Sequence, residues 1–283
     1  MILNQIKTVI LLGALTGLML LVGNLVGGRL GLTVALIFAL LMNGVTYFFS
    51  DKIVLWMYKA KEVRDKNSYL YKTVKEVSEL ANIPMPRVYI IEQDASNAFA
   101  TGRNPKNAAV ACTTGILNLL DKEELKGVIA HEISHVRNRD ILITTIAATI
   151  ATVIAYIAQM AQFAAIFGLG GENREKNGMN VVGILILAIL TPLIATILQL
   201  AISRSREYLA DESGARIIKN PKSLANALLK LERNTRINPL HIGNKAASSL
   251  FIVNPFKGEG LLTLFSTHPP VNKRIERLNS LVI

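Results

Sequence analysis

The sequence predicts a mainly helical integral membrane protein with four transmembrane helices and a cytoplasmic α+β domain that contains a small antiparallel sheet. Of the 283 residues, 51% are hydrophobic and 18% are charged, and the mean hydropathy is +0.38. This composition excludes a disordered chain, which has low hydrophobicity and dense charge. The apolar residues are concentrated in long uncharged runs, and most basic residues lie between those runs.

Four uncharged runs approach or exceed the length of about 20 apolar residues that a helix needs to cross a bilayer. They cover about residues 9–26, 32–49, 141–169 and 179–202. The first run lacks the clear cleavage site of a secretory signal, so residues 1–50 are expected to form a transmembrane hairpin. The last two runs are expected to form a second hairpin over 141–202, and the alternative is a pair of buried core helices.

Basic residues predict the orientation of these helices. Of the 31 Lys and Arg residues, 14 lie in 51–140 and 13 lie in 203–283. Cytoplasmic flanks carry such an excess, so both segments and the N-terminus are expected in the cytoplasm. The two segments then form one domain that the second hairpin divides. Short strands are expected near 87–91, 97–101 and 108–112, because turn-forming residues separate these apolar stretches.

The net charge of +11 and the isoelectric point near 9.8 raise the question of nucleic-acid binding. The sequence contains no zinc-finger spacing, no aromatic RNA-binding motif and no clear basic recognition helix, so anionic lipid is the expected partner of these charges. It also lacks a phosphate-binding loop motif, so no nucleotide is expected. The single cysteine, Cys112, excludes an intrachain disulfide framework.

Residues 121–135 read DKEELKGVIAHEISH and predict a helix. Asp121 is a favourable N-cap, and Glu124 occupies the third helical position of a capping box. Apolar residues recur at helical spacing behind this cap.

The helix carries a pattern that is typical of metal-dependent hydrolases. His135 is four positions after His131, so both imidazoles project from one face and can bind one Zn²⁺. Glu132 follows the first histidine and can reach a water molecule rather than the metal. The alternative is an ordinary helix that carries two histidines by chance.

A catalytic zinc site needs a third protein ligand, for which His241, His268 and carboxylates are the candidates. The segment 203–215 reads SRSREYLADESGA and directly follows the fourth apolar run. If the last two runs pair as a hairpin, this segment meets the histidine helix at the same membrane face. Glu207 can then bind the metal, and Asp211 can accept a hydrogen bond from a ligand histidine. The alternative is a charged juxtamembrane helix.

The combination of HEISH, REYLAD and STHPP in a four-helix membrane chain resembles the HtpX family of membrane zinc metalloproteases, relatives of the type I CAAX prenyl proteases. The resemblance covers nearly the whole chain and implies a zincin-like cytoplasmic domain with one zinc ion. It implies that His131, His135 and Glu207 bind zinc, that Glu132 is the catalytic base, and that Asp211 supports a ligand. It also implies membrane-protein quality control in the bacterial cytoplasmic membrane.

Two further residues are candidates to stabilise the developing oxyanion. His268 lies in the sequence Ser-Thr-His-Pro-Pro, and the similar position in related proteases implies this role. Arg274 can do the same, or it can anchor the structure through Asp211 or Glu276.

The segment from Asn97 to Gly102 also resembles a family motif. We expect an edge strand that pairs with an extended substrate, and its alternative is a plain turn followed by a strand. The substrate-binding candidates are Asn97, Ala98, Phe99 and Ala100.

The sequence therefore predicts a membrane zinc endopeptidase that cleaves misfolded or damaged membrane proteins on the cytoplasmic side, and self-cleavage is also expected. One alternative is a CAAX-type processing protease, although enclosing a lipidated peptide would need more than four helices. Another is a non-catalytic metal-binding membrane scaffold.

Overall fold

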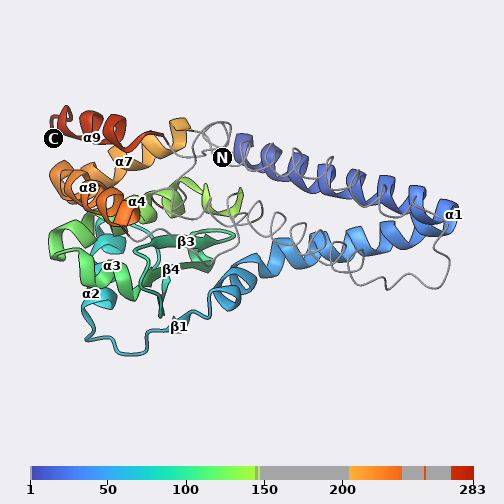
Figure 1. The fold of residues 1–283 in the computed structure, drawn as a ribbon, viewed down its shortest axis with the longest axis horizontal. Helices are drawn as coiled ribbons and strands as arrows, with labels where there is room; N and C mark the ends of the chain where they lie inside the picture. The colour runs from blue at the N-terminus through green and yellow to red at the C-terminus, as the bar shows by residue number, and fades with distance from the viewer. Residues whose placement is uncertain (1, 144–145, 147–203, 238–251, 253–268) are drawn as a thin grey trace.

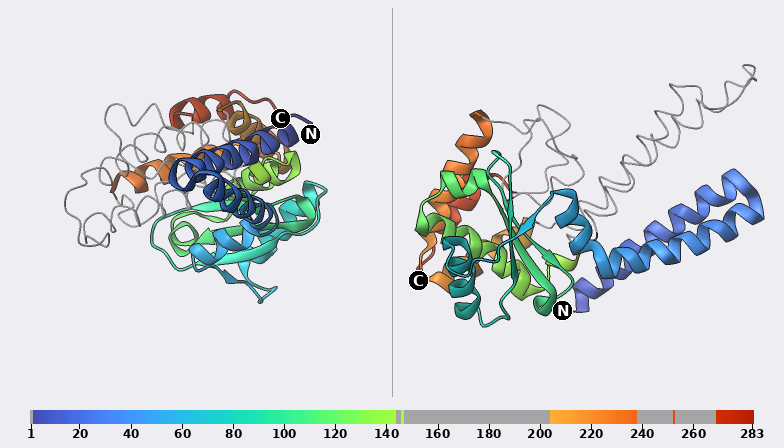
Figure 2. Two further views of the ribbon diagram at one scale, coloured as in Figure 1. Left: turned by 90° about the vertical axis from the view of Figure 1, so that its right-hand side faces the viewer. Right: turned by 90° about the horizontal axis from the view of Figure 1, so that it is seen from below.

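The computed structural model describes residues 2–143, 146, 204–237, 252 and 269–283. A long helical hairpin extends from a globular part that contains a sheet and several packed helices (Figures 1 and 2). The expected helix at 179–202, nearly all of the one at 141–169, and His241 and His268 lie outside the described residues.

The hairpin is formed by α1 (Ile2–Met57), which changes direction at Gly28. Gly28 has φ 56° and ψ −135°, a backbone conformation that residues with a Cβ rarely adopt. The two arms contact each other where the Asn43 Nδ2 donates to Thr16 Oγ1 at 2.7 Å. Within the described part of the chain, Gly28–Val45 has the length and apolar character to cross a membrane, and it overlaps the expected helix at 32–49. The other three expected transmembrane helices stay predictions.

The sheet has four strands in the order β1-β2-β4-β3. Their bounds are Lys61–Glu62 (β1), Arg87–Ile91 (β2), Ala98–Gly102 (β3) and Ala108–Thr113 (β4). The prediction of a purely antiparallel sheet is wrong, because β2 and β4 are parallel while the other two pairs are antiparallel. The link between β2 and β3 reverses the chain direction, so these two strands run antiparallel, but they are not neighbours. The strand β4 lies between them, parallel to β2 and antiparallel to β3.

The remaining described elements are α2 (Tyr69–Leu80), η1 (Pro105–Asn107), α3 (Thr114–Leu119), α4 (Lys122–Asn138), α7 (Arg204–Ile218), α8 (Pro221–Ile237) and α9 (Val271–Asn279). One face of the sheet packs with α2, α4 and α8 in the main hydrophobic core. The other face packs against the end of α1, where Val54 and Leu55 contact the cluster that includes Phe99. The helical hairpin is thereby joined directly to the sheet.

The expected capping box of α4 is present. Glu124 N donates to Asp121 Oδ1 at 2.9 Å, and Asp121 N donates to Glu124 Oε2 at 3.0 Å. The helix ends at Asn138, and the next residue, Arg139, has a left-handed φ of 60°. This turn directs Asp140 back towards the last turn of α4, where Asp140 N donates to His135 O at 3.0 Å.

We predict that Gly28→Ala destabilises the hairpin by about 1–3 kcal/mol, because the backbone of Gly28 lies in a region that is strained for alanine. Gly44→Ala is the matched control, since Gly44 lies within the same helix with no neighbouring atom inside 4 Å of an added Cβ. Thermal unfolding of the full chain in detergent measures both effects. Equal unfolding midpoints for the two variants would contradict the strained turn.

Candidate metal centre and active site

The site depends on an unusually close approach of α4 and α7. A Cβ added to Gly214 of α7 would lie 2.9 Å from the backbone nitrogen of His131 on α4. Glu207, Asp211 and Gly214 follow one another at intervals of four and three residues, so they lie on one face of α7. Because Gly214 has no side chain, the backbones of α7 and α4 can approach closely here. This approach places Glu207 and Asp211 next to the histidines of α4.

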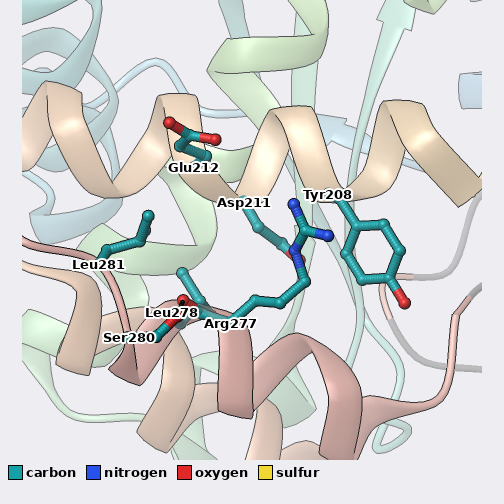
Figure 3. Close-up of a pocket in the computed structure, with 7 residues that line it drawn as sticks. All are labelled: Tyr208, Asp211, Glu212, Arg277, Leu278, Ser280 and Leu281. Atoms are coloured by element: carbon teal, nitrogen blue, oxygen red, sulfur yellow. Dashed lines mark hydrogen bonds between the residues drawn. The ribbon is translucent and has the colours of Figure 1, made fainter.

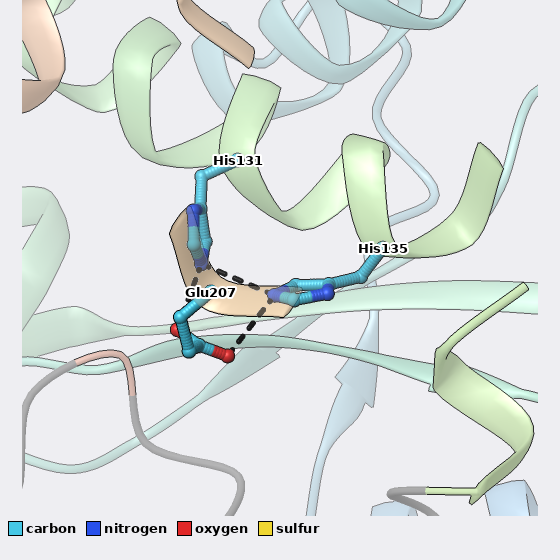
Figure 4. A group of neighbouring side chains, drawn as sticks. All are labelled: His131, His135 and Glu207. Atoms are coloured by element: carbon cyan, nitrogen blue, oxygen red, sulfur yellow. Dashed lines mark hydrogen bonds and ion pairs between the residues drawn. The ribbon is translucent and has the colours of Figure 1, made fainter. Parts of the chain in front are cut away.

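His131, His135 and Glu207 meet at this contact (Figure 4). The two Nε2 atoms are 3.3 Å apart. Glu207 Oε2 lies 3.6 Å from His131 Nε2, and Glu207 Oε1 lies 3.4 Å from His135 Nε2. His131 and Glu207 are almost completely buried, while His135 is slightly more accessible. The structure thus brings together the three predicted ligands.

The spacing of these donor atoms fits a tetrahedral ion. Ligand atoms at about 2.0–2.1 Å from a tetrahedral centre lie about 3.3–3.4 Å from one another. The two Nε2 atoms are 3.3 Å apart, which agrees with that value, and each oxygen of Glu207 lies 3.4 or 3.6 Å from a different Nε2 atom. The two imidazole nitrogens and the Glu207 carboxylate are therefore close enough to one another that they could hold a single metal ion.

Asp211 lies behind the first histidine. Its Oδ1 is 2.9 Å from His131 Nδ1, and both of its oxygens accept hydrogen bonds from Arg274 at 2.7 and 2.8 Å. Arg274 Nη1 donates to Ile252 O at 2.8 Å. Burial alone would raise the pKa of Asp211, but the charge and hydrogen bonds of Arg274 outweigh burial and lower this pKa to about 2. Asp211 is therefore an anion at neutral pH that can fix the orientation of His131.

The packing of α9 on α7 positions Arg274. Beside Arg274, a pocket of about 140 Å³ lies between the two helices (Figure 3). The guanidinium of Arg277 lies 4.3 Å from the centre of the Tyr208 ring, which holds the helices together one turn away. Of the two anchors that the sequence left open for Arg274, the structure places it on Asp211.

Asp140 has the same relation to the second histidine and was missed by the sequence analysis. Its Oδ2 lies 3.5 Å from His135 Nδ1, and its Oδ1 lies 3.9 Å from Arg206 Nη1. Burial lowers the pKa of His135, but hydrogen bonds to Asp140 and Glu207 outweigh burial and raise it to about 10. The available signal was a carboxylate placed five residues after His135, directly beyond the helix end.

Glu132 points towards the sheet rather than joining the three ligands. Its Oε2 accepts a hydrogen bond from Ala100 N at 2.9 Å, and its side chain is buried. Burial raises the pKa of Glu132, although the neighbouring His131 and His135 lower it. The carboxylate is therefore close to both the histidine pair and a backbone donor of β3.

The predicted substrate segment forms most of β3, which is one of the two edge strands of the sheet. All its residues are buried in this structure. Asn97 precedes the strand, and its Oδ1 accepts a hydrogen bond from Ile252 N at 3.3 Å. Phe99 faces the end of α1, and its ring centre lies 5.4 Å from that of Tyr58. Ala100 is the residue of this segment that contacts Glu132.

Comparisons with known proteins agree with this arrangement. The sequence profile of peptidase family M48 matches residues 64–282. The chain belongs to peptidase family M48. A protein named protease HtpX homolog from Desulfatibacillum aliphaticivorans is 54% identical over 276 residues, which are 97% of this chain and 89% of the relative. A protein of the same name from Pyrococcus abyssi is 48% identical over 280 residues, 98% and 96% of the two chains.

A solved structure extends the comparison to the fold. The crystal structure of S. mikatae Ste24p matches with a TM-score of 0.53 at 18% identity. The match covers 98% of this chain but 66% of that one, so this chain spans about two thirds of the length of that protein. Membership of the HtpX group of M48 peptidases identifies the chain as a membrane metalloprotease that acts on polypeptides.

We predict that Asp211→Asn lowers the stability of the chain by about 3–5 kcal/mol at neutral pH, because it removes the nearer of the two carboxylates that pair with the buried charge of Arg274. The wild-type contribution of Asp211, about 2 kcal/mol, is present above pH 4 and is lost as the pH falls towards 2, since folding lowers this pKa. Thermal unfolding at a series of pH values measures both effects.

Asp65→Asn is the control, because Asp65 is an exposed carboxylate outside the site. It should follow the wild-type acid profile. An Asp211→Asn variant that unfolds at the wild-type temperature at neutral pH would contradict the role of this ion pair.

Proposed function

We propose that the chain is a zinc-dependent endopeptidase of a bacterial cytoplasmic membrane, and that it cleaves misfolded or damaged membrane proteins on the cytoplasmic side. The observation that supports the chemistry most strongly is the meeting of His131, His135 and Glu207, with Glu132 beside them. The metal site lies in the same globular part as the edge strand β3, which is joined to the membrane hairpin.

His131, His135 and Glu207 would hold one zinc ion. A donor set of two imidazoles and one carboxylate favours zinc over magnesium or calcium, which prefer more oxygen ligands. When bound, zinc supplies a Lewis acid that lowers the pKa of water and polarises a carbonyl group. Asp211 and Asp140 would keep the Nδ1 protons of the two histidines directed away from the ion, so that each Nε2 lone pair is available.

Glu132 would act as the general base and then as the general acid. Its carboxylate takes a proton from the attacking water while the water oxygen bonds to the scissile carbonyl carbon. The same carboxyl group then gives the proton to the amide nitrogen as the carbon–nitrogen bond breaks. Burial raises the pKa of Glu132, which makes this carboxylate a stronger base than an exposed glutamate.

The edge strand β3 would bind the substrate in an extended form. A segment that pairs with β3 displaces the contact between Ala100 N and Glu132, which frees the base as the substrate arrives. Folded proteins rarely offer an extended segment of this kind, so the geometry favours unfolded or damaged substrates. Asn97, Ala98, Phe99 and Ala100 would form the binding strand.

His268 would donate to the developing oxyanion. Arg274 is less suited to that role, because its Nε, Nη1 and Nη2 groups already donate to Asp211 and Ile252. We therefore propose that Arg274 positions Asp211, and through it His131, rather than contacting the substrate.

The multi-pass topology and the cytoplasmic side rest on the basic flanks of the apolar runs. A site that is anchored to a membrane hairpin meets the loops and ends of other membrane proteins, including those of a second copy of the chain. A CAAX-type processing protease would instead require a lipidated substrate. A non-catalytic scaffold does not agree with membership of a metalloprotease family.

We predict that Glu132→Gln lowers the cleavage rate of an unfolded, unmodified test protein by about 10²–10⁴-fold, because it removes the proton carrier. The variant keeps its metal, since Glu132 is not one of the three grouped donors. Cleavage by the purified full chain in detergent is followed by gel electrophoresis and mass spectrometry. Glu123→Gln is the control, because Glu123 is exposed on the same helix.

Unchanged cleavage by Glu132→Gln would overturn the peptidase mechanism. Cleavage of a prenylated peptide but not of the unmodified protein would support the processing alternative. Self-cleavage should also stop in the Glu132→Gln variant, so that its intact yield exceeds that of the wild type.

We predict that Glu207→Ala lowers the zinc content of the purified chain from about one ion per chain to well below half, because it removes one of three protein ligands. Glu212→Ala is the matched control on the same helix, since Glu212 pairs with Arg216 instead. Elemental analysis after dialysis against a weak chelator measures both. Full zinc content in the Glu207→Ala variant would exclude Glu207 as a ligand.

A further inference from the structure

We propose that a basic pocket at the end of α1 binds the phosphodiester headgroup of an anionic phospholipid. The pocket, named here the foot pocket, has a volume of about 480 Å³. It is formed by the end of α1, the segment before and at the start of β2, and the turn between β3 and β4. Its lining residues are Phe48, Phe49, Asp51, Lys52, Met85, Arg87, Arg103, Lys106, Asn107 and Ala108.

The foot pocket has an excess of positive charge. Four basic side chains line it, against a single carboxylate. That carboxylate, Asp51, is already paired with Arg87, whose Nη2 lies 2.7 Å from Asp51 Oδ2. Among the residues that the structure describes, Lys52, Arg103 and Lys106 form no ion pair with a carboxylate. Three positive charges therefore remain for an anionic ligand.

Aromatic rings position two of these charges. Lys52 Nζ lies 5.2 Å from the centre of the Phe49 ring, and the Arg103 guanidinium lies 5.5 Å from that of Phe48. Contact with a ring face orients a cation without using its hydrogen-bond donors. Lys52 and Arg103 can therefore still donate to phosphate oxygens, and arginine does so with a planar pair of N–H groups.

The position of the foot pocket along α1 indicates a lipid as the source of the phosphate. The uncharged run that contains Gly28–Val45 continues to residue 49 and ends three residues before Lys52, which is about 4.5 Å along a helix axis. The headgroup layer on each side of the hydrocarbon core is about 5–8 Å thick. Phe48 and Phe49, whose rings are exposed, are the last apolar residues of this run and would border the headgroup layer. A headgroup phosphate thus lies at the depth of the three charges.

Lipid binding would also act on the proposed substrate strand. Arg103 directly follows β3, and Lys106 belongs to η1, which leads into β4. A headgroup that contacts Lys52 and Arg103 together would fix the end of β3 against the end of α1. The binding itself is independent of the metal and of peptide cleavage.

The single tryptophan of the chain offers a direct readout. Trp56 is four residues beyond Lys52, about 6 Å along α1, and its side chain is 79% exposed. The full chain carrying Glu132→Gln is reconstituted in phosphatidylcholine vesicles that contain a small fraction of brominated phosphatidylglycerol or brominated phosphatidylcholine. Bromine quenches nearby tryptophan, so the ratio of the two quenching efficiencies reports lipid selectivity at this site.

We predict that the wild-type pocket prefers phosphatidylglycerol and that Arg103→Gln with Lys106→Gln lowers this preference by about fivefold for each charge removed. The matched control is Arg64→Gln with Lys66→Gln, which removes one arginine and one lysine charge from an exposed segment that follows β1 and does not line the pocket. It should keep the preference to within about twofold. Circular dichroism and thermal unfolding of each variant verify that the fold is intact.

Equal loss of preference in both double variants would overturn the pocket, because it would indicate diffuse attraction to the anionic surface. Equal quenching by the two brominated lipids in the chain with an unchanged pocket would overturn the proposal as well. Millimolar inorganic phosphate, added at constant ionic strength, separates the two possible sources of the ligand. Preference that survives phosphate supports the lipid headgroup, whereas complete loss assigns the pocket to free phosphate and contradicts the proposal.

Discussion

The close contact between α4 and α7 is the constraint on which the rest of the site depends. Backbone atoms of Ala130 and His131 occupy the space that a side chain at residue 214 would need. Gly127 makes the corresponding contact with α8, where an added Cβ would lie 2.6 Å from Leu224 N. Because these helices touch at the level of their backbones, the short carboxylate of Glu207 reaches between two imidazoles that project from another helix.

Around this contact, carboxylates lie on both sides of each histidine ring. Each histidine directs its Nε2 towards Glu207 and its Nδ1 towards a second carboxylate, Asp211 or Asp140. Three buried carboxylates in such a small volume would repel one another without compensation. Arg274, which is buried on α9, offsets part of that charge through its hydrogen bonds to Asp211. A divalent cation would complete the compensation.

Local signals predicted the helix, its cap and the ligand pair, because all of them depend on residues within one or two turns. The positions of β2, β3 and β4 followed from turn-forming residues in the same way. The mixed strand order could not be predicted in this way, because the insertion of β4 between β2 and β3 depends on tertiary packing. The role of Asp140 could not be predicted from the sequence, because its approach to His135 depends on the left-handed turn at Arg139. The third ligand required both a motif and an assumption about how distant helices pair.

The most direct test is anomalous diffraction at the zinc absorption edge from crystals of the full chain carrying Glu132→Gln. One peak should lie about 2.0–2.2 Å from His131 Nε2, His135 Nε2 and a Glu207 oxygen. A peak bound by the histidines while Glu207 lies well outside bonding distance, or a peak elsewhere in the chain, would contradict the shared centre between α4 and α7.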